Sequence, residues 1–244
     1  MRILVIGESC RDIFHYGICE RLCPDAPVPV FKPTHTIENH GMAMNVENNL
    51  KAMEVDVDLH TNENWKELTK TRYVDSKTNH MFIRIDHGEG DYGQSSIQDI
   101  AIRYDFYDAV IISDYNKGFL TKRDIQWIAQ QHPITFLDTK KPVGNWCKDI
   151  RFIKINNYEY QKALPKLKEI TDKLIITTGP EGAIHKGKVF PVPQVEIKDS
   201  SGAGDTFISA LAVKFVQCGD IDQAIRAANL AATKVVQKKG VTTV

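Results

Sequence analysis

Short runs of branched apolar residues recur along the chain, each followed by polar residues or glycine. The clearest examples are residues 3–6, 109–112, 134–137 and 174–177. Such runs are typical of strands that are covered on both faces in a mostly parallel sheet. Between them, Thr121 precedes a helical pattern and Asp124 follows three residues later, close to a capping box. This alternation predicts an α/β fold: a doubly wound, mostly parallel sheet flanked by helices, with ligands at the carboxyl ends of the strands.

Two other strand-like stretches have a different character. Residues 28–31 contain a proline, and residues 80–85 alternate apolar and polar side chains. Both features suit a small, half-buried sheet apart from the main one. We expect it to form a lid over a ligand cleft, with strands inserted within about residues 12–38 and 71–90. No linker or repeat divides the chain, so residues 1–244 are predicted to form a single domain.

The C-terminal part of the chain has the clearest helical pattern. From Gly204, apolar residues recur at helical spacing as far as Gly219. A second, alanine-rich helix is expected from about Ile221, and Gly240 is its natural stop.

Composition and charge narrow the possible partners. Among 244 residues, 31 basic and 31 acidic side chains cancel, which removes any global electrostatic reason to bind nucleic acid or an anionic membrane. The five cysteines include no CxxC pair, so we expect reduced thiols rather than a metal or redox site. The apolar run at the N-terminus is too short for a signal peptide, and no run approaches membrane-spanning length. The protein is therefore expected to be cytoplasmic.

The most informative segment is DSSGAGDTF, residues 199–207, at the start of the first C-terminal helix. Small residues let a ligand approach the backbone, and the unpaired first amides of the helix form an anion site together with its dipole. A carboxylate here, Asp205, would repel a phosphate, but it suits a general base that accepts a hydroxyl proton during phosphoryl transfer. The alternative is that Asp199 and Asp205 only cap a helix whose glycines permit tight packing.

This segment resembles the C-terminal signature of the ribokinase-like (PfkB) sugar kinases. The resemblance implies a ribokinase-like fold and ATP as phosphoryl donor, with Asp205 as the catalytic base. It also implies that the amides of Gly202, Ala203 and Gly204 stabilise the transferred phosphoryl group. Residues 156–159, NNYE, resemble the family's NxxE motif, and Glu159 would help to place Mg²⁺, commonly through water. Alone, NxxE would usually be just a helix start.

Further segments are similar to one branch of this family, the kinases that act on D-glycero-D-manno-heptose 7-phosphate in lipopolysaccharide-core precursor synthesis. They are residues 21–30 (RLCPDAPVPV), 113–118 (SDYNKG) and 228–232 (ANLAA), with Lys238 and Gly240 beyond. The branch resemblance implies phosphorylation of the anomeric hydroxyl. It also implies a homodimer in which the two lids pair, and exposed strand edges give an independent reason to expect one.

Carried over position by position, the resemblance implies roles for further residues. Sugar contacts are expected at Asp12, Gly41, Asn45 and Lys117. Nucleotide contacts are expected at Asn156, Thr178, Gly179, Val195, Ile197, Asn229 and Lys140. Purely structural roles stay open for several of these, because Asn45 could cap a helix, Asn229 could be a satisfied polar group between helices, and the lysines could be solvated. The need for a monovalent cation also stays open.

Two departures from the family pattern bear on the function. Met42 stands where the family has the second glycine of a pair under the sugar, so a different substrate or a shifted loop is expected. Residues 51–70 are polar apart from a brief alternation at 55–59, where relatives build another strand-and-helix unit. Two alternatives follow: a kinase for another sugar, or a non-catalytic nucleotide- or sugar-binding protein. A nicotinamide enzyme is disfavoured because residues 6–10 lack the glycine fingerprint.

Overall fold

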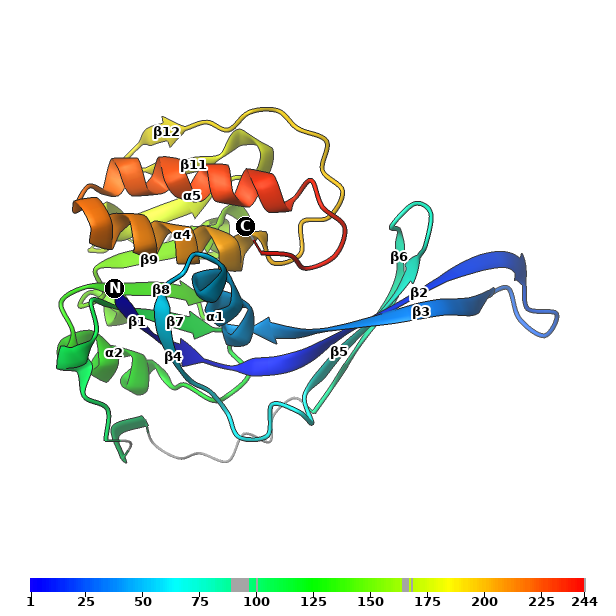
Figure 1. The fold of residues 1–244 in the computed structure, drawn as a ribbon, viewed down its shortest axis with the longest axis horizontal. Coiled ribbons are helices and arrows are strands. Elements are labelled where there is room, and N and C mark those ends of the chain that lie inside the picture. The colour runs from blue at the N-terminus through cyan, green and yellow to red at the C-terminus, as the bar shows by residue number, and fades with distance from the viewer. Residues whose placement is uncertain (89–96, 100, 164–166, 168, 244) are drawn as a thin grey trace.

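The computed structural model describes residues 1–88, 97–99, 101–163, 167 and 169–243. Residues 89 and 90, the end of the expected lid segment, lie outside this description. The described residues form an eight-stranded sheet and a four-stranded sheet, and helices pack against the larger one (Figure 1). The α/β fold with a second, smaller sheet is thus confirmed.

The larger sheet contains the buried strands that the apolar runs predict. Its strands are β1 (Arg2–Gly7), β4 (Asp56–His60), β7 (Ala109–Asp114), β8 (Thr135–Thr139), β9 (Phe152–Asn156), β10 (Leu174–Thr177), β11 (Ala183–His185) and β12 (Lys188–Phe190). Their order is β12-β11-β10-β9-β8-β7-β1-β4. The strands from β10 to β4 are parallel, and β11 and β12 add an antiparallel hairpin at one edge. The carboxyl ends of the parallel strands therefore meet at one edge of the sheet.

Helices cover both faces of this sheet (Figure 1). One face carries α1 (Ala43–Ala52), α4 (Ala203–Cys218) and α5 (Ile221–Val235), and the other carries α2 (Lys122–Gln131) and α3 (Asn157–Ala163). In β1, Ile3 and Val5 pack with the first group of helices, whereas Leu4 and Ile6 pack with the second. Because side chains alternate between the faces, a strand covered on both sides is apolar at every position, which made these strands recognisable in the sequence.

The start of α2 and the end of α4 lie where the sequence predicts them. The Thr121 hydroxyl accepts the Asp124 amide (3.2 Å), and the Asp124 carboxylate accepts the Thr121 amide (2.8 Å), so the capping box is complete. Helix α4 ends before Gly219, whose left-handed conformation (φ 68°) terminates it as expected.

Helix α5 ends earlier than the sequence predicts. It stops at Val235 instead of continuing to Gly240. The carbonyl of Val236 accepts the amides of Lys198 (2.8 Å) and Asp199 (3.2 Å), so it is drawn out of the helical ladder. Gly240 lies beyond in a turn (φ 73°) and donates its amide to the Asp199 carboxylate (3.2 Å). The chain after α5 is thereby tied to the loop before α4.

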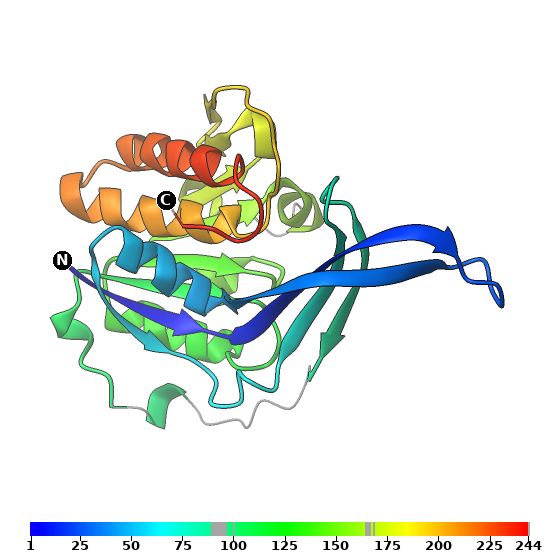
Figure 2. The ribbon, with the colours of Figure 1, turned by 45° about the vertical axis from the view of Figure 1, so that its right-hand side comes forward.

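The second sheet is present as predicted, but its strands are longer. They are β2 (Ser9–Leu22), β3 (Pro29–Met42), β5 (Thr69–Asp75) and β6 (Met81–His87), in the order β3-β2-β5-β6. The hairpin of β2 and β3 projects from the body of the molecule (Figure 2). The predicted strand at 28–31 covers only the start of β3. Side chains in the outer part of this hairpin are mostly exposed on both faces, so no alternating pattern marks it in the sequence.

The brief alternation at 55–59 is also a strand. It forms β4, which pairs in parallel with β1 at the edge of the larger sheet. Residues 61–68, between β4 and β5, form turns and no helix, so the edge remains uncovered by a further strand-and-helix unit. Within the part of the chain that the structure describes, every helix is too short or too polar to span a bilayer.

Candidate active site

Asp205 lies in the first turn of α4 at the carboxyl-end edge of the larger sheet, and it is only 5% exposed. Its carboxylate accepts hydrogen bonds from the Asn45 side-chain amide (2.7 Å) and the Tyr115 hydroxyl (2.9 Å). No side chain caps the start of α4. The capping alternative is therefore wrong for Asp205. Asp199 does have a structural role, because its carboxylate accepts the amides of Ser201 and Gly240.

Burial raises the pKa of Asp205 above its ordinary value. The hydrogen bonds from Asn45 and Tyr115 oppose this shift, since they stabilise the ionised form, while the nearby Asp138 adds to it. A carboxylate that is held by two donors and made more basic by burial is suited to accept a proton.

The backbone before Asp205 is open to a ligand because side chains are excluded there. Gly202 adopts a left-handed conformation (φ 78°), and a Cβ at this position would lie 2.8 Å from the Asn45 amide nitrogen. A Cβ on Gly204 would lie 2.7 Å from the Lys154 ammonium nitrogen. The amide of Ala203 makes a long 3.3 Å bond to the Ser200 carbonyl, and the first amides of a helix have no partner within the helix. The loop thus presents backbone donors and the positive end of the α4 dipole.

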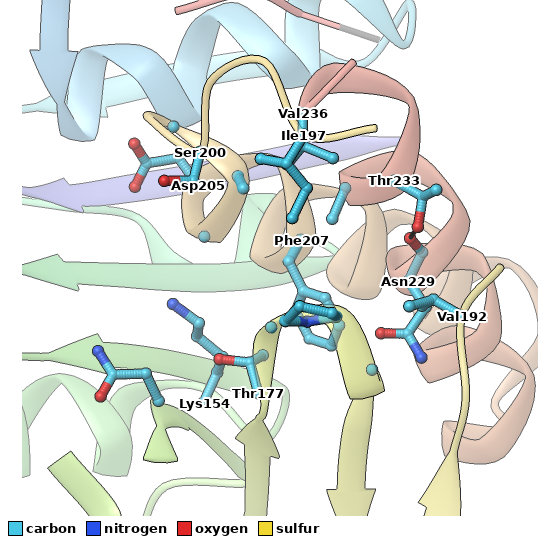
Figure 3. Close-up of a pocket in the computed structure, with 18 of the residues that line it drawn as sticks. Lys154, Thr177, Val192, Ile197, Ser200, Asp205, Phe207, Asn229, Thr233 and Val236 are labelled. Carbon is cyan, nitrogen blue, oxygen red and sulfur yellow. Dashed lines mark hydrogen bonds between the residues drawn. The ribbon is translucent and has the colours of Figure 1, made fainter. Parts of the chain in front are cut away.

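A pocket of about 520 Å³ opens beside these residues. It is lined by many of the residues predicted to bind the nucleotide, to stabilise the transferred phosphoryl group or to act as the base, namely Lys140, Asn156, Gly179, Val195, Ile197, Gly202, Ala203, Gly204, Asp205 and Asn229. Figure 3 shows Asp205 and Lys154 at one side of the pocket, and Ile197, Val236 and Asn229 toward the other. The cavity therefore has a charged end and a more apolar end, a combination typical of sites for small polar molecules.

Some predicted nucleotide residues have structural contacts. The buried Asn229 donates its side-chain amide to the Phe190 carbonyl (2.7 Å), so it is a satisfied polar group as well as part of the pocket wall. Thr178 is not among the lining residues, and its hydroxyl donates to the Gly182 carbonyl (3.1 Å) in the turn after β10. Asn229 therefore lines the pocket, whereas Thr178 does not.

The NxxE segment forms the start of α3. The Asn156 side chain accepts the Glu159 amide, and the Glu159 carboxylate accepts the Asn156 amide, both at 2.8 Å. The other carboxylate oxygen of Glu159 accepts from the Lys140 ammonium group (2.6 Å). Both oxygens are thus engaged, which fits contact with Mg²⁺ through water better than direct ligation. Among the described residues, no three His, Cys, Asp or Glu side chains gather as a metal site of their own.

A chain of charges crosses the carboxyl ends of β8 and β9. Asp138 pairs with Lys154 (2.7 Å) and lies 3.7 Å from Lys140, which in turn pairs with Glu159. Burial alone would raise the pKa of Asp138, but the two lysines hold it below the ordinary value. Burial opposes the charge of Lys140, yet Asp138 and Glu159 raise its pKa. Lys140 therefore keeps its positive charge, and both lysines line the pocket.

The residues predicted to contact sugar lie outside the pocket lining, around the junction of the two sheets. Asp12 is buried on β2 and forms an ion pair with Arg72 of β5. Gly41 lies beside it, since an added Cβ would be 3.3 Å from the Asp12 Cβ. Asn45 lies in α1, just after β3, and it reaches Asp205 instead of capping the helix. Of these residues, Asn45 contacts Asp205 directly, whereas Asp12 and Gly41 lie next to each other on the second sheet.

Lys117 contributes to this region through its backbone. Its amide and that of Tyr115 donate to the two oxygens of the fully buried Glu8, which fixes the loop after β7. Lys117 also lies close enough to Lys70 to lower the pKa of that second, largely buried lysine, although desolvation is the larger cause. The loop thereby holds the Tyr115 hydroxyl against Asp205.

Met42 adopts a backbone conformation that favours glycine (φ 65°, ψ −128°). Its side chain is buried against Cys10 and Leu68, next to Tyr115 and Phe119. The methionine therefore packs beside the residue that holds Asp205. A non-glycine residue in this region is strained, typically by about 1–3 kcal/mol.

Sequence reasoning missed several residues that complete the site. Tyr115 lies within the SDYNKG segment, but only Lys117 was assigned there. Lys154 is a lysine within the otherwise apolar FIKIN strand, and this placement was an available signal. Asp138 and Arg72 become meaningful only through the partners that the fold gives them, Lys154 and Asp12.

Comparison with curated proteins and a family model gives a consistent result. The model of the pfkB family carbohydrate kinases matches residues 151–244. The chain is 31% identical over 291 aligned residues to the bifunctional protein HldE of a Nitratiruptor species, covering 99% of this chain and 63% of that protein. It is 32% identical over 296 residues to HldE of Sulfurimonas denitrificans, covering 100% of this chain and 62% of that protein. The chain thus spans less than two thirds of the length of these relatives.

Solved structures resemble the fold at low sequence identity. Ribokinase from Thermotoga maritima superposes with a TM-score of 0.70 at 15% identity, covering 98% of this chain and 94% of that one. Ribokinase of Arabidopsis thaliana, complexed with ribose and ATP, gives 0.70 at 16% identity, covering 98% and 93%. These matches establish the ribokinase-like fold. The segment that matches the pfkB family model, residues 151–244, contains the GAGD loop at the start of α4, so this part of the chain is similar to the pfkB carbohydrate kinases.

Proposed function

We propose that this chain transfers a phosphoryl group from ATP to a sugar hydroxyl, with Asp205 as the base. The observation that carries the proposal is the position of the Asp205 carboxylate. It lines the pocket, accepts hydrogen bonds from Tyr115 and from Asn45, one of the residues expected to hold the sugar, and is made more basic by burial. A base at the boundary of two binding regions is what in-line transfer between two substrates needs.

The pocket suggests how the nucleotide would lie. Its apolar side, with Val195, Ile197 and Val236, offers surfaces for a purine ring. The phosphates would then extend toward the backbone of Gly202 to Gly204, where amide donors and the α4 dipole favour negative charge. Mg²⁺ would neutralise phosphate charge near Glu159, held through water.

In the reaction, Asp205 accepts the proton of the sugar hydroxyl as the hydroxyl oxygen attacks the terminal phosphorus of ATP. Asn45 and Tyr115 keep the carboxylate in place, so little reorganisation is needed as the proton moves. The second sheet would act as a lid over the sugar and exclude water. A kinase that uses ATP and a soluble sugar fits the cytoplasmic location expected from the sequence.

We further propose a phosphorylated sugar as the acceptor, D-glycero-D-manno-heptose 7-phosphate at its anomeric position. The segments similar to the heptose branch and the HldE relatives support this choice. A second support comes from β5 and β6 of the lid, where Arg84 lies close enough to lower the pKa of both Lys70 and Arg72, although desolvation is the larger cause for each. Such a group of cations suits an anionic acceptor better than a neutral sugar.

Met42 favours a second candidate, a kinase of the same family for another sugar. Its side chain packs beside Tyr115, at the edge of the region where the sugar would lie. A non-catalytic nucleotide- or sugar-binding protein is a third candidate. It rests on the reduced segment 51–70, and the held carboxylate of Asp205 speaks against it.

The test is ATP-dependent phosphorylation across a sugar panel that includes D-glycero-D-manno-heptose 7-phosphate. We expect turnover of the heptose phosphate, and a loss of about 10²–10⁴-fold for Asp205→Asn. Asp222→Asn, at an acidic position in the first turn of α5, is the matched control and should be active. Turnover of a different sugar would support the proposed mechanism but contradict the heptose phosphate as substrate. ATP binding without turnover of any sugar would favour the binding protein.

A further inference from the structure

Lys154 is a buried cation within the larger sheet. It lies in β9 between apolar neighbours, only 5% exposed, and pairs with the equally buried Asp138 of β8 at 2.7 Å. A buried ion pair of this kind is often less stable than an apolar pair of similar size, because both charges must leave water. Its presence in the core strands therefore calls for a reason other than stability.

The ammonium group of Lys154 points at the loop that starts α4. A Cβ on Gly204 would lie 2.7 Å from the Lys154 nitrogen, so this nitrogen touches the backbone of the GAGD segment. Lys154, Gly204 and Asp205 all line the same pocket, and Figure 3 shows the lysine at the end of the pocket where Asp205 lies. The lysine thus adds a full positive charge to a loop that otherwise offers only backbone dipoles.

We propose that Lys154 binds the terminal phosphate of the nucleotide and stabilises the phosphoryl group during transfer, with Asp138 as its positioning residue. This inference rests on the proposed kinase function. In the step, the bond from the terminal phosphorus to the bridging oxygen breaks, the sugar oxygen bonds to that phosphorus, and the hydroxyl proton goes to Asp205. Lys154 keeps its protons throughout. It contributes charge and hydrogen bonds to the phosphoryl oxygens.

The inference gives Gly204 a specific role. Any larger residue at this position would push its Cβ against the ammonium group and separate it from the α4 amides. Glycine therefore lets two kinds of donor, the lysine and the backbone, converge on one phosphate. Lys140 lies at the same pocket but is paired with Glu159 on the side of α3, so it is less directly placed toward Gly204.

A neighbouring ion pair serves as a control. Lys141 pairs with Asp114 at the ends of β8 and β7, with side chains 11% and 0% exposed. Neither residue lines the pocket. Replacing Lys141 by methionine therefore breaks a buried lysine–aspartate pair in the same sheet without changing the charge that faces the ligand.

The experiment measures the affinities of ATP, ADP and AMP by calorimetry, without sugar, for the wild type, Lys154→Met and Lys141→Met. For Lys154→Met we expect about 10–100-fold weaker ATP binding, a smaller loss for ADP and unchanged AMP binding. Lys141→Met should keep the wild-type order of affinities. Asp138→Asn should lower kcat more than it raises the KM for ATP, because the lysine remains but is less well placed.

Equal ATP affinity in the wild type and Lys154→Met would overturn the assignment of Lys154. Equal losses for ATP and ADP would also overturn it, because the lysine would then contact an inner phosphate. If Lys154→Met does not fold, as judged by its melting curve, Lys154→Gln keeps a polar side chain beside Asp138 and is expected to show the same losses. A wild-type chain that binds none of the three nucleotides would sink the kinase proposal itself.

Discussion

At the scale of single residues, the central feature is the buried carboxylate of Asp205, which accepts two hydrogen bonds. Burial raises the pKa of Asp205, and the donors Asn45 and Tyr115 pull it back. Each donor therefore sets the pH at which the base becomes available, in addition to fixing its direction. The two partners come from different elements, α1 and the loop after β7.

Replacing Tyr115 by phenylalanine should reveal the effect of this donor on the pKa of Asp205. The Tyr115 hydroxyl stabilises the ionised carboxylate, so its removal raises the pKa of Asp205 further. Since the base works only when ionised, the acidic limb of the pH profile of kcat/KM should move to higher pH. The measurement is that profile for the wild type and Tyr115→Phe.

Tyr107→Phe is the matched control for this change. The Tyr107 hydroxyl also donates to an aspartate, Asp58 (2.7 Å), on the edge strand β4 and outside the pocket lining. Its removal should leave the acidic limb in place. An unmoved limb in Tyr115→Phe would show that the tyrosine does not tune the base.

Met42 allows a second prediction, in which glycine is more stabilising than alanine, the reverse of their usual order. Both Met42→Ala and Met42→Gly lose the same buried side chain, but only glycine relaxes a backbone at φ 65° and ψ −128°. Glycine elsewhere is about 0.5–1 kcal/mol less favourable than alanine in regular structure. Here Met42→Gly should be about 1 kcal/mol more stable than Met42→Ala in urea unfolding, given the strain typical of such positions. An alanine variant that is the more stable would mean that this backbone is not strained.

Residue roles were predictable from sequence to different degrees. Asp205 could be identified because a carboxylate at a helix start beside an anion site is chemically unusual. The role of Tyr115 depends on Asp205, 90 residues away, and gave no local signal; Lys154 was marked by its apolar strand, but its partner Asp138, 16 residues away, could not be assigned from sequence. The residues next to a position in the sequence do not indicate which distant residues it will contact.

At the scale of elements, predictability followed burial. Strands covered on both faces, such as β7 (Ala109–Asp114), were evident from sequence because every side chain is buried. The outer part of β2 and β3 was not, since its side chains are largely exposed and its pairing depends on backbone hydrogen bonds. The end of α5 was misplaced because a contact with Lys198 and Asp199, distant in sequence, competes with helix continuation.

The edge strand β6 leads to a prediction about assembly. Met81, Ile83 and Ile85 alternate along it and are 47%, 53% and 48% exposed. An apolar row on an open sheet edge is suited to pairing with a second copy of the lid, as the family resemblance implies. Ile83→Lys should therefore weaken a homodimer at least about tenfold in sedimentation experiments, because a charge would be buried at the interface.

The control for this prediction is Leu230→Lys in α5. Leu230 is also 53% exposed, but it belongs to α5, which packs on the larger sheet and is not part of the second sheet. This variant should sediment as the wild type does. A wild-type chain that is monomeric at high concentration would contradict the assembly proposed for the lid.

At the scale of the whole molecule, the site is a meeting point of distant parts of the chain. The larger sheet brings the ends of β8, β9 and β10 to one edge, α4 supplies the proposed base, and the second sheet supplies Asp12 and Gly41, two of the residues expected to hold the sugar (Figure 1). The fold class could be predicted because the alternation of strands and helices is local information. The junction between the two sheets could not, because it is set by packing of their surfaces.

The contact between Asn45 and Asp205 spans 160 residues of sequence, and that between Tyr115 and Asp205 spans 90. During synthesis, Asn45 and Tyr115 leave the ribosome long before Asp205 exists. The growing chain can therefore form β1 and α1, but it has neither the base nor the helices α4 and α5 that bury the apolar face of α1. Such distant pairings are slow to close. The proposed phosphoryl transfer therefore requires a chain that has been synthesised as far as α4 and α5, and a shorter product cannot consume ATP by this route.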